Sequence, residues 1–215
     1  MFRTALLCIL LAVAAYASSA WLTHDFQVWT AEGARRLEVS LQPIAAPAVK
    51  IDGPSIGPES LVLSQFLADG QSVTLVDFVY TRCQTVCLAL GSTFQQMQAT
   101  LQAASPDDAA ARRIRLLSIS FDGQHDEPQV LKAYAERLGA DPLRWLFVRV
   151  PDAKEAQRLL ADFQVVVVPD GRGDFEHNAA LLVIDQRGRL VRIFDNAEQQ
   201  LALDYARSLT SSVLP

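Results

Sequence analysis

The chain has 215 residues, of which 50% are hydrophobic and 20% charged, so it has enough apolar material for one globular domain with a substantial core. Its formal net charge is -5, and Lys and Arg never occur in runs longer than two. We therefore exclude a nucleic-acid partner, because phosphate binding requires a concentrated basic surface.

The N-terminal segment, residues 1–23, is predicted to be an export signal, a membrane anchor, or both. Residues 4–23 contain no charged side chain, and this length is close to the roughly 20 residues that span a bilayer. Arg3 supplies a positive N-terminal region, and Ser18–Ala20 resembles a small-residue cleavage site. We expect a retained anchor with Trp21 at the membrane interface.

The position of Arg3 favours an orientation with the folded part on the far side of the membrane. In a bacterial cell this corresponds to an inner-membrane anchor with the domain in the periplasm, or to a secreted soluble form if the signal is cleaved. Cys8 is interpreted as a small apolar residue of the membrane segment. Cys83 and Cys87 then lie in an oxidising compartment.

Residues 24–46 are predicted to be a lead-in linker, and residues 47–215 the folded domain. Proline and glycine are scattered among short apolar runs up to residue 60, which indicates one strand or hairpin in this part.

From residue 72 onward, strand and helix patterns alternate. Strands are predicted over 72–80, 113–121 and 145–150, and helices over 88–103, 128–138 and 152–163. Two more strands, 180–185 and 189–194, flank a Gln-Arg-Gly hairpin signature, and a last helix covers 198–209. This order predicts an α/β thioredoxin-like fold, with a central mixed sheet flanked by helices.

Cys83 and Cys87 stand where a buried-type strand passes into a helix, the edge at which open α/β sheets place ligands. Four residues apart on a helix, their side chains share one face and can bind one metal ion or each other. A disulfide over three intervening residues would stabilise the fold little, which counts against a purely structural bridge. The helix N-terminus and Arg82 should lower the pKa of both thiols. The pair suits redox exchange, soft-metal binding, or both.

The chain has three histidines. His24 at the membrane boundary is expected to be solvated, and His125, in a loop before a helix, to be exposed. His177 ends a glycine-containing loop and enters a strand, a place where a histidine is more often structural. In a thioredoxin-like layout, however, this position faces the helix that carries the cysteines. Two thiolates and one imidazole form a soft, low-coordinate ligand set, which favours Cu(I) over Zn²⁺.

Three segments of the chain resemble the Sco/SenC/PrrC family in the order found there. They are Phe78–Cys87, Leu117–Ala135 and Phe175–Gly188, and the resemblance extends from roughly Pro47 to the C-terminus. It implies a membrane-anchored, thioredoxin-like protein that serves copper-centre assembly in cytochrome c oxidase.

The resemblance also implies roles for individual residues. Cys83 and Cys87 match the CxxxC thiolates of the family, and His177 matches its copper-binding histidine. Asp122 matches an acidic residue after the second strand, which we expect to be an outer-shell partner of the site.

The chain departs from the family at several positions near these residues. Gln84 and Thr85 replace the usual Pro-Asp between the cysteines, and Leu88 replaces the proline after them. Glu176 and Asn178 flank the histidine where Asp and Ser are more common. These changes keep the three ligands and affect copper affinity and the balance between metal delivery and thiol chemistry.

The family resemblance implies a copper chaperone that delivers copper, Cu(I) before Cu(II), to the copper A centre of cytochrome c oxidase. Its partners would be the copper A-bearing subunit, a periplasmic thiol reductant or copper donor, and the membrane. The alternative is a thiol-disulfide oxidoreductase that reduces the copper-ligand cysteines of that subunit, so enzymatic activity stays open. The CxxxC spacing counts against a general oxidoreductase, for which CxxC is usual. A peroxidase is disfavoured, because the chain lacks the proline expected in a peroxidatic loop near Thr81 and Cys83. The remaining alternative is a structural interaction domain in which the cysteine pair forms a permanent disulfide.

Overall fold

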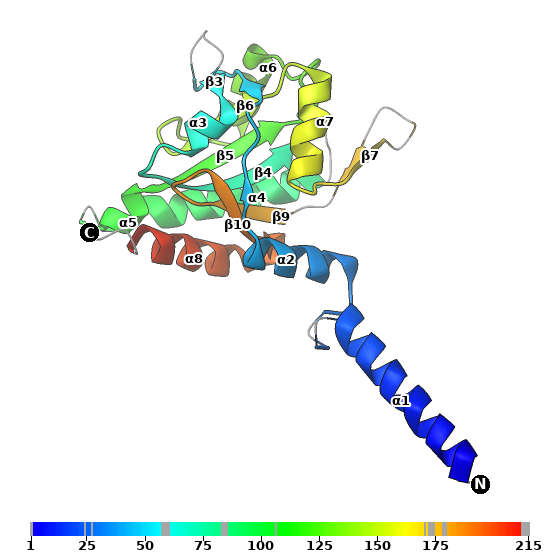
Figure 1. Cartoon of the computed structure of the whole chain (residues 1–215). Helices are drawn as coiled ribbons and strands as arrows, with labels where there is room; N and C mark the ends of the chain where they lie inside the picture. Colours follow the sequence, from blue (N-terminus) through cyan, green and yellow to red (C-terminus); the bar gives the residue numbers. More distant parts are fainter. Residues whose placement is uncertain are drawn as a thin grey trace.

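The computed structural model is shown in Figure 1. It describes residues 2–23, 25–26, 28–56, 61–82, 86–105, 107–169, 171, 175–177 and 180–211, with the backbone alone at 86–89, 169, 176–177 and 211. The helix α1 (Phe2–Leu22) is long and apolar enough to cross a membrane, extends away from the domain, and has no buried residue.

A six-stranded mixed sheet forms the centre of the domain, in the order β1-β10-β9-β4-β5-β6. The bounds are β1 (Ile44–Ala45), β10 (Arg189–Asp195), β9 (Ala180–Ile184), β4 (Val73–Val79), β5 (Ile114–Ser120) and β6 (Trp145–Arg149). The strands β4, β5 and β6 are parallel, whereas β9 is antiparallel to β4 and to β10. The predicted mixed α/β sheet is therefore confirmed.

Helices cover both faces of this sheet. Every residue of β4 is therefore buried, and its apolar side chains pack into two clusters, one on each face. Leu75 belongs to the cluster with α4 (Val86–Gln102), α6 (Pro128–Arg137) and α8 (Gln199–Ser211). Val76 and Phe78 belong to the cluster with α2 (Ala31–Leu41), α3 (Leu63–Leu67) and α7 (Ala153–Asp162). The short helix α5 (Ala109–Arg112) precedes β5.

The strands and helices predicted from residue 72 onward agree with the structure to within a few residues at each end. Asp152 caps α7 as predicted, accepting hydrogen bonds from the backbone N–H groups of Lys154 and Glu155 at 2.9 Å. The part of the chain before residue 72 contains the short pair β2 (Lys50–Ile51) and β3 (Leu61–Val62), in agreement with the predicted strand or hairpin, and also α2, which the sequence did not predict. The hairpin of β7 (Val167–Pro169) and β8 (Phe175–His177) is likewise additional.

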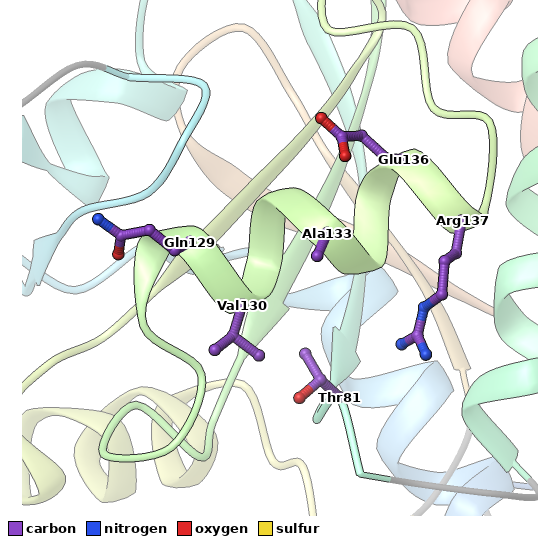
Figure 2. Close-up of a pocket in the computed structure, with 6 residues that line it drawn as sticks. All are labelled: Thr81, Gln129, Val130, Ala133, Glu136 and Arg137. Carbon is purple, nitrogen blue, oxygen red and sulfur yellow. The ribbon is translucent and has the colours of Figure 1, made fainter.

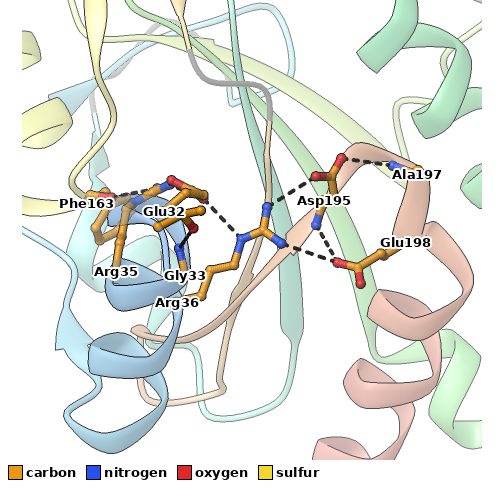
Figure 3. A network of polar contacts seen from close by, with 9 residues as sticks. Glu32, Gly33, Arg35, Arg36, Phe163, Asp195, Ala197 and Glu198 are labelled. Carbon is orange, nitrogen blue, oxygen red and sulfur yellow. Dashed lines mark hydrogen bonds and ion pairs between the residues drawn. The ribbon is translucent and has the colours of Figure 1, made fainter. Parts of the chain in front are cut away.

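The helix α2 fixes the start of the chain to the domain through two arginines (Figure 3). Arg36 contacts Glu32 in its own helix, Asp195 at the end of β10, and Glu198 in the 3-10 turn η1 (Asn196–Glu198) that follows. Arg35 is buried, and its guanidinium donates a hydrogen bond of 3.2 Å to the carbonyl oxygen of Phe163 at the end of α7. The segment after α1 is thus attached both to the sheet and to the helix that precedes β7.

Asp77 is a fully buried carboxyl in the middle of β4. Neither of its carboxylate oxygens has a hydrogen-bond partner in the described part of the chain. Burial raises the pKa of Asp77 from 3.8 to about 7, and the nearby Ser118 hydroxyl, which lies outside hydrogen-bond geometry, opposes this rise only in part.

This raised pKa predicts that the protein becomes less stable as the pH rises from about 4 to about 7. In that range folded Asp77 retains a proton that the unfolded chain has lost, so each pH unit lowers the free energy of unfolding by up to about 1.4 kcal/mol. Asp77→Asn removes this contribution. We therefore expect the free energy of unfolding of the variant, minus that of the native chain, to be larger at about pH 8 than at about pH 5. Urea unfolding at the two pH values measures this difference.

The exposed Asp107 offers a matched control, because Asp107→Asn removes one carboxylate without removing a buried one. A native stability difference between the two pH values that Asp77→Asn leaves unchanged would contradict the prediction.

Candidate metal centre

The structure places two of the three predicted ligands by their backbone. Cys87 is the second residue of α4, and His177 is the last residue of β8. Cys83, and His24, which we expected to be solvated, lie outside the described residues. Among the side chains that are described, no three His, Cys, Asp or Glu residues gather at one point.

Tyr80 joins the end of β4 to the strand that carries His177. Its hydroxyl donates a hydrogen bond of 3.2 Å to the carbonyl oxygen of Phe175 and accepts one of 3.3 Å from the Phe175 N–H. The rings of Tyr80, Phe121 and Phe175 pack with centroids 5.2–5.5 Å apart. Since Cys83 follows Tyr80 by three residues and His177 follows Phe175 by two, segments 95 residues apart converge here.

The buried carboxylate of Asp126 holds the next residue of the same segment. It accepts hydrogen bonds from the Thr81 N–H at 3.0 Å and the Thr81 hydroxyl at 2.6 Å. The Ser120 hydroxyl at the end of β5 donates a third, also at 2.6 Å. Because Asp126 has no exposed surface, these three donors replace its water, and Thr81 is fixed to the β5–α6 loop.

Asp122 lies beside this loop and contacts the residue before Cys83. Its carboxylate is 2.8 Å from a guanidinium nitrogen of Arg82 and 2.9 Å from Nδ1 of His125. His125 is exposed, as predicted. Arg82, which we expected to favour thiolates, has its charge paired with Asp122, so its field at the cysteines is weaker than the sequence indicated.

An open hollow of about 800 Å³ lies between Thr81 and α6 (Figure 2). Five residues of α6 complete its wall: Gln129, Val130, Ala133, Glu136 and Arg137. Val130 is 41% exposed, so the wall offers apolar contact together with both signs of charge. The segment leading to Cys83 is therefore approachable from the α6 side.

The geometry defines a thioredoxin-like domain in which a central strand, held by Asp126 and Tyr80, passes into a cysteine-bearing helix. The sequence model of the SCO1/SenC family matches residues 66–210. The chain belongs to this family, as the motifs predicted.

Individual relatives agree with this assignment. The SCO1 protein homolog of Bacillus subtilis (strain 168) is 26% identical over 149 residues, which cover 68% of this chain and 70% of that protein. A SCO1/SenC family lipoprotein from Bacillus anthracis superposes with a TM-score of 0.65 at 20% identity, covering 78% of this chain and 97% of that one. Copper-bound ScoI from Bradyrhizobium japonicum gives a TM-score of 0.59 at 22% identity, with coverage of 77% and 99%.

Sequence reasoning did not find Asp126 or Tyr80, because both act through contacts between distant segments. Asp77 could have been found, since it is the one charged residue in the run Val73–Val79. A single carboxyl within an otherwise uncharged, buried-type strand indicates an unusual buried charge from the sequence alone.

Loss of the Asp126 carboxylate should destabilise the domain and loosen Thr81. Asp126→Ala leaves three donors without an acceptor, of which the Ser120 hydroxyl is buried and the two of Thr81 are part-buried, so we expect the free energy of unfolding to fall by about 1–3 kcal/mol. Urea unfolding measures this, and proteolysis near residue 81 reports the loosening. Asp107→Ala, which removes an exposed carboxylate, is the control and should change neither. Equal stability of the two variants would show that Asp126 does not hold this segment.

Proposed function

We propose that the protein is a copper chaperone, in which Cys83, Cys87 and His177 bind copper and pass it to the copper A centre of cytochrome c oxidase during assembly. One observation carries the proposal. Two hydrogen bonds join Tyr80, three residues before Cys83, to Phe175, two residues before His177, which supports a site shared by the cysteines and the histidine. Two thiolates and an imidazole suit Cu(I), with Cu(II) as the second state.

Structures of relatives support copper as the cargo. ScoI from Bradyrhizobium japonicum, ScoI from Arabidopsis thaliana and yeast Sco1 have each been solved with copper bound. Another solved relative, BsSco, is described as a member of the Sco family of cytochrome c oxidase assembly proteins. The copper A-bearing subunit is the proposed recipient, and a periplasmic copper donor or thiol reductant would act before it.

The proposed location follows from α1. We assign residues 1–23 to an inner-membrane anchor, residues 24–46 to the lead-in, and residues 47–215 to the copper-binding domain in the periplasm. Asp122 is proposed as an outer-shell residue, since it reaches Arg82 directly before Cys83. Metal binding requires both cysteines as thiolates, so loading releases protons and oxidation of the pair prevents it.

The first test is competition for Cu(I) between the reduced full chain in detergent and a chelator. A Cys8→Ala background removes the exposed thiol of α1. We expect one ion per chain, with affinity lowered at least tenfold by His177→Ala and unchanged by His125→Ala, which removes an exposed imidazole. Tyr80→Phe keeps the aromatic packing but loses both hydrogen bonds to Phe175, so it should weaken binding by a smaller factor. Equal affinities of the native chain and His177→Ala would rule out the three-ligand site.

A thiol-disulfide oxidoreductase is the second candidate, favoured by the disulfide switch described for BsSco. One thiolate of the pair would attack a partner disulfide, and the other would resolve the mixed disulfide. The partner gains two electrons and leaves as a dithiol, while Cys83 and Cys87 become a disulfide that a periplasmic thiol must reduce.

This second activity predicts a different pattern among the variants. Reduction of an oxidised peptide with the two cysteines of a copper A site should be abolished by Cys87→Ser and retained by His177→Ala. A chaperone without reductase activity would leave that peptide oxidised. Mass spectrometry of trapped thiols measures both outcomes.

A further inference from the structure

Four aromatic side chains lie along the last two turns of α1 and on the segment that follows it. The ring centroid of Phe26 is 5.4 Å from that of Tyr16 in α1 and 6.0 Å from that of Trp29. The indole N–H of Trp29 donates a hydrogen bond of 3.2 Å to the carbonyl oxygen of Phe26. Trp21 stands in the last turn of α1. We call Tyr16, Trp21, Phe26 and Trp29 the aromatic collar.

The chain reverses direction after α1, and this reversal returns the ring of Phe26 to the helix. Asp25 and Phe26 have φ angles of 56° and 62°, a left-handed conformation that residues other than glycine seldom adopt. The Asp25 N–H donates a hydrogen bond of 2.7 Å to the carbonyl oxygen of Ala20. The Thr23 hydroxyl donates one of 2.6 Å to the carbonyl oxygen of Ser19 and accepts one of 3.0 Å from the Phe26 N–H. Local hydrogen bonds therefore hold the collar in place.

The collar is joined directly to α2. Thr30 follows Trp29 and caps α2, its hydroxyl accepting a hydrogen bond of 3.0 Å from the Gly33 N–H. Val28 lies against the same turn, because a Cβ atom at Gly33 would stand 3.1 Å from the Val28 side chain. The collar thus has a helix on either side, and its position affects where the domain begins.

The described part of the chain leaves most of this aromatic surface open. Trp21 is 80% exposed, Trp29 73% and Tyr16 68%, and α1 has no buried residue. Figure 1 shows α1 leading away from the domain, so the sheet and its helices do not cover the collar. A group of exposed aromatic side chains of this size indicates a binding surface.

The height of the collar on α1 indicates what it binds. The 21 residues of α1 span about 31 Å, close to the roughly 30 Å of a bilayer's hydrocarbon core. Tyr16 stands six residues, or roughly 9 Å, before the end of α1 at Leu22. When α1 spans a bilayer, the collar therefore falls near the boundary between acyl chains and headgroups. Tyr and Trp are enriched at this boundary, because each has an apolar ring with a polar atom.

The charges near the collar exclude attraction to anionic headgroups as the main source of binding. Residues 4–34 contain no Lys or Arg, and their acidic residues are Asp25 and Glu32. Polybasic segments are what anionic lipids attract. Partition of the aromatic rings into the interface is therefore the interaction that this surface offers.

We propose that the aromatic collar binds the interfacial region of a phospholipid bilayer at the domain end of α1. It sets the depth of α1 and the point at which α2 leaves the membrane surface. Trp29 lies in the lipid interface although it stands seven residues beyond the end of α1. This inference deepens the proposed location and rests on the assignment of α1 as a membrane anchor.

The test is quenching of tryptophan fluorescence by brominated lipids, with the full chain in phosphatidylcholine vesicles. Trp145 is buried in the domain and serves as a constant background. Trp21→Phe leaves Trp29 and Trp145, and the further change Trp29→Phe leaves Trp145 alone, so the difference between these two variants isolates Trp29. We expect bromine near the headgroup end of the acyl chain to remove at least about half of the Trp29 emission, and bromine at the methyl end to remove less.

Trp29 emission that is quenched by aqueous iodide but by neither brominated lipid would overturn the proposal. Addition of phosphatidylglycerol should leave the quenching unchanged. Quenching that appears only with this anionic lipid would likewise overturn interfacial binding through the aromatic rings.

Phe26→Ala tests the collar as a unit, because it removes the ring that packs against both Tyr16 and Trp29. In the Trp21→Phe background we expect it to lower the quenching of Trp29 at least twofold. Leu41→Ala is the matched control, since it removes an exposed apolar side chain at the end of α2. It should leave the quenching unchanged. Equal quenching in the two variants would overturn the collar arrangement.

The single variant Trp29→Phe separates failure of this inference from failure of the anchor assignment. Lipid quenching of Trp21 in this variant, together with unquenched Trp29 in Trp21→Phe, would reject the collar and keep the anchor. A chain that does not float with the vesicles, with neither tryptophan quenched, would reject the anchor as well. Absent Cu(I) binding by a chain with a quenched Trp29 would reject only the proposed copper function.

Discussion

The candidate site depends on how the end of β4 is held. The Tyr80 hydroxyl uses both its donor and its acceptor capacity on one residue, Phe175, so it acts as a two-point clamp across segments far apart in sequence. Asp126 acts on the next residue in the same manner, with a carboxylate and three donors. Together they leave little freedom to the residues that lead into the cysteine pair.

Local sequence patterns were sufficient for most of the fold. The strands β4 and β5 are predominantly apolar runs, and α7 begins after Asp152, whose side chain caps it, so each could be recognised from its own residues. The helix α2 could not be recognised in this way, because its buried residues are Arg35 and Val39 and an arginine does not mark a buried face in a sequence. Arg35 can be buried here because its guanidinium donates a hydrogen bond to the carbonyl oxygen of Phe163. The strands β7 and β8 are three residues long, too short for an alternating pattern to be distinguished from a loop.

The site shows the same division between local and distant information. The residue types and spacing of Cys83, Cys87 and His177 identified the candidate ligands and the family, because soft ligands in a CxxxC pair are a local pattern. The supports of the site are ordinary residues, Tyr80, Ser120 and Asp126, whose importance comes only from the partners that the fold gives them. Likewise, the pairing of Arg82 with Asp122 depends on a loop 40 residues away, so the charge near the cysteines could not be assessed from neighbours in sequence.

Two buried carboxyls near the end of β4 illustrate how environment separates identical groups. Asp126 accepts three hydrogen bonds, whereas neither carboxylate oxygen of Asp77 has a hydrogen-bond partner among the described residues and burial raises its pKa. An apolar residue at position 77 would pack in the same layer without this conflict. The carboxyl at position 77 therefore lowers the stability of the folded state around neutral pH.

The attachment of α2 has a consequence for how far the domain can travel. Only residues 23–30 separate α1 from α2, and a segment of that length spans at most about 30 Å when extended. The contacts of Arg35 and Arg36 hold α2 on the domain, so α2 does not lengthen this link. If α1 spans a bilayer, a link of this length would confine the domain to a thin layer above the surface, where it would meet its partners by lateral diffusion. Such confinement raises the local concentration of membrane-bound partners and excludes those that remain far from the bilayer.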